Sequence, residues 1–283
     1  HDVAQAINAR HENPMFLPGV TLPRTLVATS SIADAVDGCQ GLLFVVPSHV
    51  TRSVLTALAP CMAKPIPLIS ATKGIEEETA KLMTQVMDDV LPLPMRPMIM
   101  ALSGPSFAAE LSAGKPTALC LAGREPALVQ QFQHTLMTPV FRVYADTDLI
   151  GVQLGGALKN VMALAAGVVD GLELGLNARA ALITRGLAEI VRLGTAMGAD
   201  PRTFYGLSGI GDLVLTCTGT LSRNYTVGMR LGKGEPLDTI VGGMHAVAEG
   251  VRTARAALEL ARRHDVDMPI TQEINAVLLN QKP

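Results

Sequence analysis

Lys159 is the residue whose surroundings most clearly point to chemistry. It is the only charge in an apolar stretch with helical spacing that covers residues 149–169. A helix that buries such neighbours also partly buries the ammonium, which lowers the pKa of a lysine and lets it act as a general acid or base near neutral pH. Gly155 and Gly156 lie one turn earlier and leave room for a ligand or another chain. A lysine whose stem packs while its charged end reaches water fits the same pattern, so both interpretations stay open.

Polar, turn-forming residues follow three short apolar runs in the first half of the chain. The runs cover residues 41–46, 66–70 and 98–102. Ligands of open α/β sheets bind beyond the carboxyl ends of the strands, so the residues after the runs should face one crevice. Lys73 follows the second run, and Ser106 after the third could cap the next helix, whose free N–H groups would face an anion. His49, after the first run, is more typical of a cap or a loop.

The segment 207–224 holds the remaining candidates. Asp212 precedes an apolar turn, so it could cap a helix, and Thr216 lies one turn later on the same face. Ser222 is a typical N-cap residue, and Arg223 can bind a phosphate through two hydrogen bonds. An arginine near a helix start is usually solvated, so its functional interpretation depends on Lys159, Asp212 and Arg223 converging.

Composition and missing motifs exclude several classes of function. The 283 residues carry 23 Lys+Arg and 25 Asp+Glu, and aromatic residues are only 3% with no Trp, which argues against a nucleic-acid partner. The six histidines and four cysteines show no spacing of a metal site, so no metal is expected. GxSxG, P-loop and GxGxxG motifs are absent from the sequence. Scattered cysteines without a CxxC pair indicate reduced thiols, and we expect a cytoplasmic protein.

The hydrophobic pattern predicts an α/β part followed by an all-helical part. Short apolar runs without polar alternation, separated by helices, are typical of a buried parallel sheet. Two further strands are predicted at 117–121 and 141–144, and helices at 48–60, 75–90 and 106–113. Helices alone follow, at 152–169, 177–197, 222–231, 249–264 and 270–279. We therefore predict two domains, residues 1–148 and residues 149–283.

The apolar stretch 149–169 is long enough to need a test as a membrane span. Gln153, Lys159 and Asn160 stand near its middle, and a central lysine costs about 2.5–3.5 kcal/mol on insertion. A buried helix of a soluble domain is the better interpretation, and we expect no membrane span.

Several long motifs resemble the bacterial NAD(P)-dependent glycerol-3-phosphate dehydrogenase family. They are NPMFLPG at 13–19, VVPSH at 45–49, SATKG at 70–74, SGPSFAAEL at 103–111, GVQLGGALKNVMALAAG at 151–167, NARAALITRGLAE at 177–189, GIGDLVLTCT at 209–218 and SRN at 222–224. The resemblance covers essentially the whole chain. It implies a Rossmann-like dinucleotide-binding domain and a helical substrate domain. The implied reaction interconverts glycerone phosphate and sn-glycerol 3-phosphate, a glycerophospholipid precursor, with NAD or NADP, and a homodimer is possible.

The resemblance also implies roles for individual residues. Lys159 matches the proton donor and acceptor at the substrate C2 oxygen, with Thr216 and Asn160 as polar neighbours of the reacting centre. The implied substrate contacts are Lys73, Gly104, Ser106, Lys159, Asp212, Ser222, Arg223 and Asn224. The implied cofactor contacts are His1, Lys73, Ala108, Arg223, Val247 and Glu249.

The sequence departs from the family at its N-terminus. The family begins with a strand and a GxGxxG loop that carries the cofactor pyrophosphate, whereas His1 here corresponds to a position just after the second strand. We expect that segment, and a short helical tail after Pro283, to be missing, and a chain this short to bind cofactor poorly. The alternatives are a related β-hydroxyacid or 6-phosphogluconate-type dehydrogenase and a truncated, non-catalytic binding protein.

Overall fold

A computed structural model describes residues 2–243, 248–279 and 282. Its sheet has five strands in the order β3-β4-β5-β6-β7. They are β3 (Leu42–Phe44), β4 (Leu68–Ser70), β5 (Ile99–Ser103), β6 (Thr117–Gly123) and β7 (Phe141–Asp146). The five predicted strands are all present, with ends shifted by a few residues.

The direction of the strands changes once within the sheet. β3, β4 and β5 are parallel, β6 is antiparallel to β5, and β7 is parallel to β6. A parallel return after β5 would need a crossover helix that spans the strand. The helix in that connection, α5 (Ala108–Ser112), has five residues and is only about 7.5 Å long. The expected parallel sheet therefore holds for β3–β5, and the last two strands run the other way.

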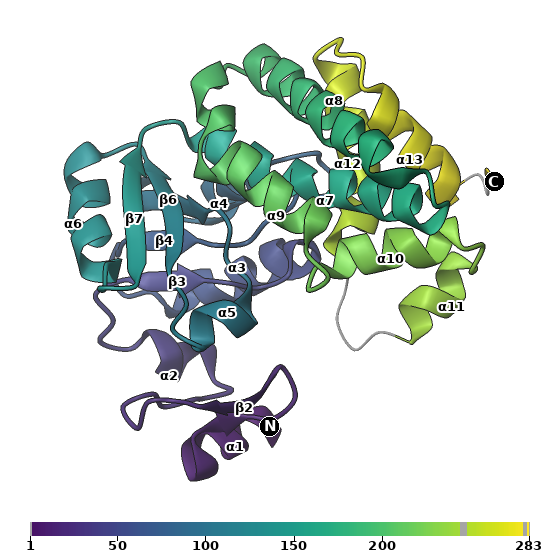
Figure 1. The fold of residues 1–283 in the computed structure, drawn as a ribbon. Helices are drawn as coiled ribbons and strands as arrows, with labels where there is room; N and C mark the ends of the chain where they lie inside the picture. The colour runs from purple at the N-terminus through teal and green to yellow at the C-terminus, as the bar shows by residue number, and fades with distance from the viewer. Residues whose placement is uncertain (1, 244–247, 280–281, 283) are drawn as a thin grey trace.

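Helices cover both faces of the sheet (Figure 1). On one face α3 (Thr51–Leu58) and α4 (Met83–Val90) pack on β3–β5 through apolar side chains such as Leu55, Val86 and Ile99. On the other face α6 (Pro126–Leu136) packs through Val129 on Met100 and Leu121. The alternation of side chains along each strand thus supplies two cores.

The N-terminal residues form a small unit below the sheet in Figure 1. It contains α1 (Asp2–Arg10), an antiparallel pair of β1 (Glu12–Asn13) and β2 (Leu17–Thr21), and α2 (Ile32–Val36). Short 3₁₀ turns at Ser48–Val50, Ala59–Cys61 and Leu93–Met98 complete the α/β part.

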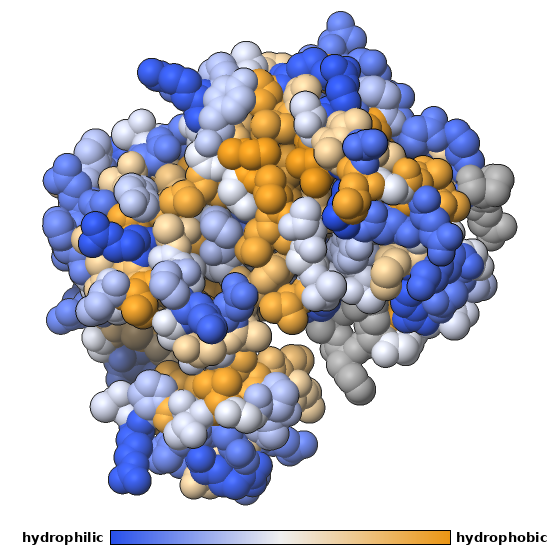
Figure 2. Space-filling view, viewed as in Figure 1, coloured by the Kyte–Doolittle hydropathy of each residue, from blue (hydrophilic) through white to orange (hydrophobic). Residues whose placement is uncertain are grey.

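All regular secondary structure after β7 in the described residues is helical. The helices are α7 (Leu149–Gly171), α8 (Gly175–Ala196), α9 (Asp212–Thr218), α10 (Arg223–Gly232), α11 (Leu237–Gly242), α12 (Glu249–Arg263) and α13 (Pro269–Leu279), with a 3₁₀ turn at Pro201–Tyr205 and a π turn at Leu207–Gly211. Figure 2, in the same view as Figure 1, shows apolar residues in the middle of the molecule, where the sheet and the helices meet, with hydrophilic residues around them.

α7 is the central helix of the molecule. It is long and apolar enough to pass a length and composition test for a membrane span, but 94% of the tested window is buried inside the protein. α8, α9, α10 and α12 all pack against it. The apolar residues of α7 are therefore those of a core helix that is buried by the rest of the protein.

Two predicted helices begin later than the pattern indicates. The helix predicted at 75–90 starts only at Met83, because residues 75–82 form an irregular segment closed by a bridge between Ile75 and Leu82. Ile75, Ala80 and Leu82 turn into the apolar core of the helical part, and this packing overrides the local helical spacing. The helix predicted at 106–113 starts at Ala108.

Candidate active site

Two lysines meet on one buried carboxylate where the sheet and the helical part join. Lys159 on α7 donates from Nζ to Asp212 Oδ1 at 2.5 Å and to Thr216 Oγ1 at 3.0 Å. Lys73, just beyond β4, donates from Nζ to Asp212 Oδ2 at 2.7 Å and to the Gly104 carbonyl at 2.8 Å. Two cations share one anion, so the cluster keeps a net positive charge.

Burial gives Lys159 the properties of a general acid or base. Its side chain is 8% exposed, and that of Asp212 is fully buried. Burial lowers the pKa of Lys159 most, the charge of Lys73 lowers it too, and Asp212 acts in the opposite direction, so that the net pKa is about 8. Both protonation states are therefore populated near neutral pH. The alternative of a lysine whose charged end reaches bulk water is wrong for this residue.

Asp212 does not cap α9, because the N-cap position is held by Gly211 and the carboxylate points to the lysines. Thr216, one turn later, donates to the Asp212 carbonyl at 2.6 Å, so its oxygen remains free to accept from Lys159. The sequence spacing that placed Asp212 and Thr216 on one face is confirmed. The helix start supplies both partners of the ammonium.

Glycines on α7 allow the elements of the cluster to approach. A Cβ on Gly155 would lie 2.3 Å from the Ser208 carbonyl oxygen, and a Cβ on Gly156 would lie 2.4 Å from Ser103 Oγ and 3.5 Å from Lys73 Cγ. Larger residues would push the end of β5 and the π turn away from α7. The room that the sequence predicted beside Lys159 is filled by other segments of the chain.

A second set of polar residues lies at the start of α10 and bonds to Asn160, the residue after Lys159 on α7. Ser222 caps this helix by accepting from the Tyr225 N–H at 3.2 Å, as its residue type predicted. Asn224 donates to Asn160 Oδ1 at 3.0 Å and accepts from the Gly250 N–H at 2.9 Å. These bonds tie the start of α10 to α7 and to the start of α12.

Close packing of α7 on α10 sets this alignment. A Cβ on Gly167 would lie 2.1 Å from the Tyr225 carbonyl oxygen, and a Cβ on Gly228 would lie 2.0 Å from that of Leu164. The two backbones therefore touch, as in small-xxx-small helix pairs. The spacing of Gly167 and Gly171, and of Gly228 and Gly232, was the signal for this contact, and our sequence analysis missed it.

Arg223 differs from its neighbours because it is exposed and has no hydrogen-bond or ion-pair partner among residues 2–243, 248–279 and 282. Burial raises the pKa of Glu249, and the hydrogen bond from the Ser48 N–H and the charge of Arg223 offset this only in part. Glu249 Oε1 accepts from the Ser48 N–H at 3.0 Å, a contact across the junction of the two parts that the sequence did not reveal.

Gly104 and Ser106 lie at the carboxyl end of β5, as predicted, but Ser106 does not cap a helix. Ser106 Oγ donates to the Gly104 carbonyl at 3.1 Å, and α5 begins at Ala108 after an N-cap position held by Phe107 without a side-chain bond. Gly104 has φ +141, where a side chain would be strained and would press on Leu119. The Gly104 carbonyl accepts from Lys73 and the helix starts only at Ala108, so the predicted Ser106 cap is wrong, while the anion site at that helix start stays a prediction.

The chain matches a known protein family over nearly its whole length. The family models described as NAD-dependent glycerol-3-phosphate dehydrogenase N-terminus and C-terminus match residues 1–129 and 148–283. The chain belongs to this family. A protein named glycerol-3-phosphate dehydrogenase [NAD(P)+] from Geobacter sulfurreducens is 52% identical over 282 residues, which cover 100% of this chain and 84% of the relative. A protein of the same name from Koribacter versatilis is 50% identical over 278 residues, which cover 98% of this chain and 82% of the relative.

Solved structures agree with this assignment. A glycerol-3-phosphate dehydrogenase from Coxiella burnetii matches with a TM-score of 0.94 and 35% identity, over 99% of this chain and 85% of the other. A ketopantoate reductase from Ralstonia eutropha matches with a TM-score of 0.56 and 16% identity, which shows a shared fold alone. The predicted family, fold class, enzyme class and NAD(P) dependence are confirmed, and the β-hydroxyacid or 6-phosphogluconate alternative is not supported.

The remaining residues predicted to contact the cofactor are His1, Val247 and Ala108. His1 and Val247 lie outside the described residues. Ala108 is exposed at the start of α5. In the part of the chain that the structure describes, no group of three or more His, Cys, Asp or Glu residues could hold a metal ion.

Proposed function

We propose that this chain interconverts glycerone phosphate and sn-glycerol 3-phosphate with NAD or NADP, and that Lys159 is its general acid and base. The observation that carries the proposal is the buried Lys159 ammonium, held by Asp212 and Thr216 and facing a second cation, Lys73. Oxidation of an alcohol needs a base for the hydroxyl proton, and the reverse direction needs an acid at the same atom.

Each group of the cluster has a distinct task. The nicotinamide cofactor, when bound, accepts the hydride that leaves the substrate carbon. Neutral Lys159 takes the proton of the C2 hydroxyl, and its protonated form returns that proton in the other direction. Lys73 and Lys159 stabilise negative charge that develops on the C2 oxygen, because preorganised cations in a buried site need no reorientation. Asp212 holds both ammonium groups in place.

The start of α10 is suited to the phosphate of the substrate. Arg223 is exposed and beside the Ser222 cap and Asn224, and its planar guanidinium binds phosphate through paired hydrogen bonds. The positive end of a ten-residue helix adds to the attraction. Binding energy from this end aligns C2 with Lys159.

The junction also offers groups for the cofactor. The buried hydroxyls of Ser70 and Ser103, at the carboxyl ends of β4 and β5, have no hydrogen-bond partner within the described residues, which fits an edge that faces a polar ligand. Lys73, Ala108, Arg223 and Glu249 would hold the cofactor, together with His1 and Val247. Residues 1–148 would form the dinucleotide-binding domain and residues 149–283 the substrate domain.

The proposal extends to the cellular setting. A supply of glycerophospholipid precursor by this reaction fits a cytoplasmic enzyme.

The corner between α7 and α8 exposes three leucines, which supports a homodimer. They are Leu172, Leu174 and Leu176, which are 53%, 58% and 71% exposed. Light scattering during size-exclusion chromatography measures the mass that decides between monomer and dimer.

Turnover of glycerone phosphate with NADPH and with NADH, beside a panel of hydroxyacids, tests the function. We expect turnover of glycerone phosphate alone, and preference for a hydroxyacid would contradict the proposal. Dinucleotide affinity, measured on the same chain, separates a catalyst from a non-catalytic binding protein. Binding without any turnover would favour the latter.

A further inference from the structure

Residues 74–82, which we name the connecting segment, leave the sheet directly after Lys73 and enter the helical part. Ile75, Ala80 and Leu82 are only 1–2% exposed, and they pack in the same core as Leu154 and Leu158 of α7. A segment from the α/β part therefore completes the core of the helical part. Because Lys73 is its immediate neighbour, the placement of the Lys73 ammonium depends on this segment.

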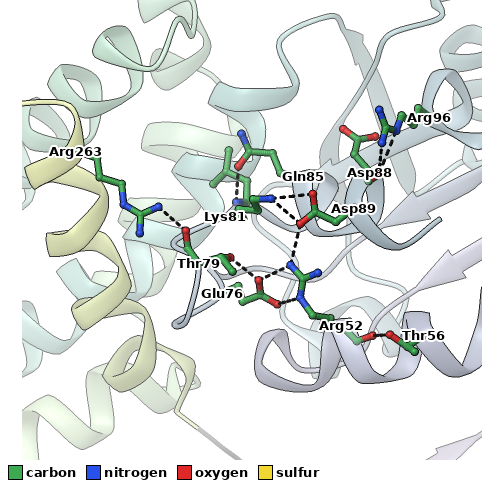
Figure 3. A network of polar contacts seen from close by, with 11 residues as sticks. Arg52, Thr56, Glu76, Thr79, Lys81, Gln85, Asp88, Asp89, Arg96 and Arg263 are labelled. Carbon is green, nitrogen blue, oxygen red and sulfur yellow. Dashed lines mark hydrogen bonds and ion pairs between the residues drawn. The ribbon is translucent and has the colours of Figure 1, made fainter. Parts of the chain in front are cut away.

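A polar network ties the connecting segment to the sheet side (Figure 3). The Arg52 guanidinium on α3 donates to both carboxylate oxygens of Glu76, at 2.8 and 2.7 Å, and to Asp89 at 3.0 Å. Lys81 also donates to Asp89, at 2.6 Å. Thr79 Oγ1 donates to Glu76 Oε2 at 2.5 Å, so the carboxylate closes the loop of the segment upon itself.

Other bonds tie the same segment to the helical side. Arg263 on α12 donates to the Thr79 carbonyl at 2.6 Å, as Figure 3 shows, and Arg252 donates to Glu77 at 3.1 Å. The connecting segment is therefore held from both sides, and one residue, Glu76, joins its beginning, its middle and α3.

Glu76 is built as a fixed anion. It is 6% exposed. Burial alone would raise the pKa of Glu76, but hydrogen bonds from Arg52 and Thr79 bring it below the ordinary value. A buried carboxylate that stays ionised holds its two donors, Arg52 and Thr79, in fixed positions. The forked geometry of the arginine guanidinium makes this interaction directional.

We propose that Glu76, through its contacts with Arg52 and Thr79, is a positioning residue that holds the connecting segment and thereby the Lys73 ammonium against Asp212 and beside Lys159. The inference rests on the proposed function of that cluster. Loss of the Glu76 charge loosens the segment, so Lys73 spends less time at its place, while Lys159, Asp212 and Thr216 remain where α7 and α9 hold them.

The test compares Glu76→Gln with Asp88→Asn. Asp88 on α4 forms an ion pair of the same kind with Arg124 and, among the described residues, makes no hydrogen bond or ion pair with the connecting segment. We expect kcat/KM for glycerone phosphate to fall about tenfold in Glu76→Gln and to change less than about twofold in Asp88→Asn. The pH midpoint of the rate should move to higher pH in Glu76→Gln alone, because Lys73 no longer lowers the pKa of Lys159.

A double-variant cycle separates positioning from folding. If Glu76 acts through Lys73, adding Glu76→Gln to Lys73→Met produces no further loss of kcat/KM. Equal losses in the two backgrounds, or an unchanged pH midpoint with a lowered melting temperature, would overturn the inference and leave a structural role. Absence of turnover in the unaltered chain would instead contradict the proposed function, so the two failures are distinguishable.

Discussion

The two ends of the candidate substrate site satisfy their charges in opposite ways. At the Lys159 end, the ammonium is buried and held by Asp212 and Thr216 before any ligand arrives. At the Arg223 end, the guanidinium is exposed and has no partner in the described ranges. A proton-transfer group needs burial to shift its pKa, whereas a phosphate-binding group needs to stay accessible and uncompensated. The comparison predicts that variants at the first end affect kcat and variants at the second affect KM.

The largest effect is expected from Lys159→Met, which keeps the volume of the side chain but removes the ammonium. We expect kcat to fall about a thousandfold in both directions with the fold retained, because the group proposed to exchange the C2 hydroxyl proton is removed. Steady-state kinetics and circular dichroism measure the two properties. Lys115→Met, at an exposed position, is the control. A kcat near that of the unaltered chain would reject the acid–base role.

Arg223→Ala tests the other end. We expect KM for the phosphorylated substrate to rise by about ten- to a hundredfold with a much smaller change in kcat, because the lost charge-assisted bonds are those of binding. Arg202→Ala removes an arginine that is 88% exposed and paired only with Asp200 in the described residues, so it should leave KM unchanged. A loss confined to kcat would erase the distinction between the two ends.

The pH dependence sharpens the comparison further. Oxidation requires neutral Lys159, so its kcat/KM should increase as pH rises through about 8, and reduction should decrease over the same range. Lys73→Met removes a cation that lowers the pKa of Lys159, so both midpoints should move to higher pH. Arg223→Ala serves as the control and should leave the midpoints in place. A shift to lower pH in Lys73→Met would contradict the assigned electrostatics.

The smallest effect on catalysis is expected from Gly167→Ala, which tests the packing that joins the two ends. A Cβ there would collide with the Tyr225 carbonyl oxygen, so we expect a loss of about 1–3 kcal/mol in the free energy of unfolding. Gly242→Ala, where none of the described residues lies within 4 Å of the added Cβ, is the matched control and should be neutral. Denaturant titration measures the free energy of unfolding of both variants. Equal values would show that the packing of α7 on α10 tolerates a methyl group at residue 167.

Local signals predicted a large part of this fold. The five strands of the main sheet could be predicted because short apolar runs without polar alternation are typical of strands buried on both faces. Ser222 could be predicted as an N-cap from its residue type. The helix predicted at 75–90 was partly wrong because residues 75–82 bury their apolar side chains in the core of the helical part. Local spacing cannot report a choice that is made by the packing of distant elements.

The sequence by itself determined that Lys159 is an isolated charge in an apolar helix, and that its surroundings would lower its pKa. Only the tertiary structure decided which groups it meets, because Asp212 and Lys73 reach the site from elements far apart along the chain. Burial of one residue follows from its immediate neighbours along a helix. Its hydrogen-bond partners and the fields of nearby charges act across space within a few ångströms, so they exist only once the chain has folded.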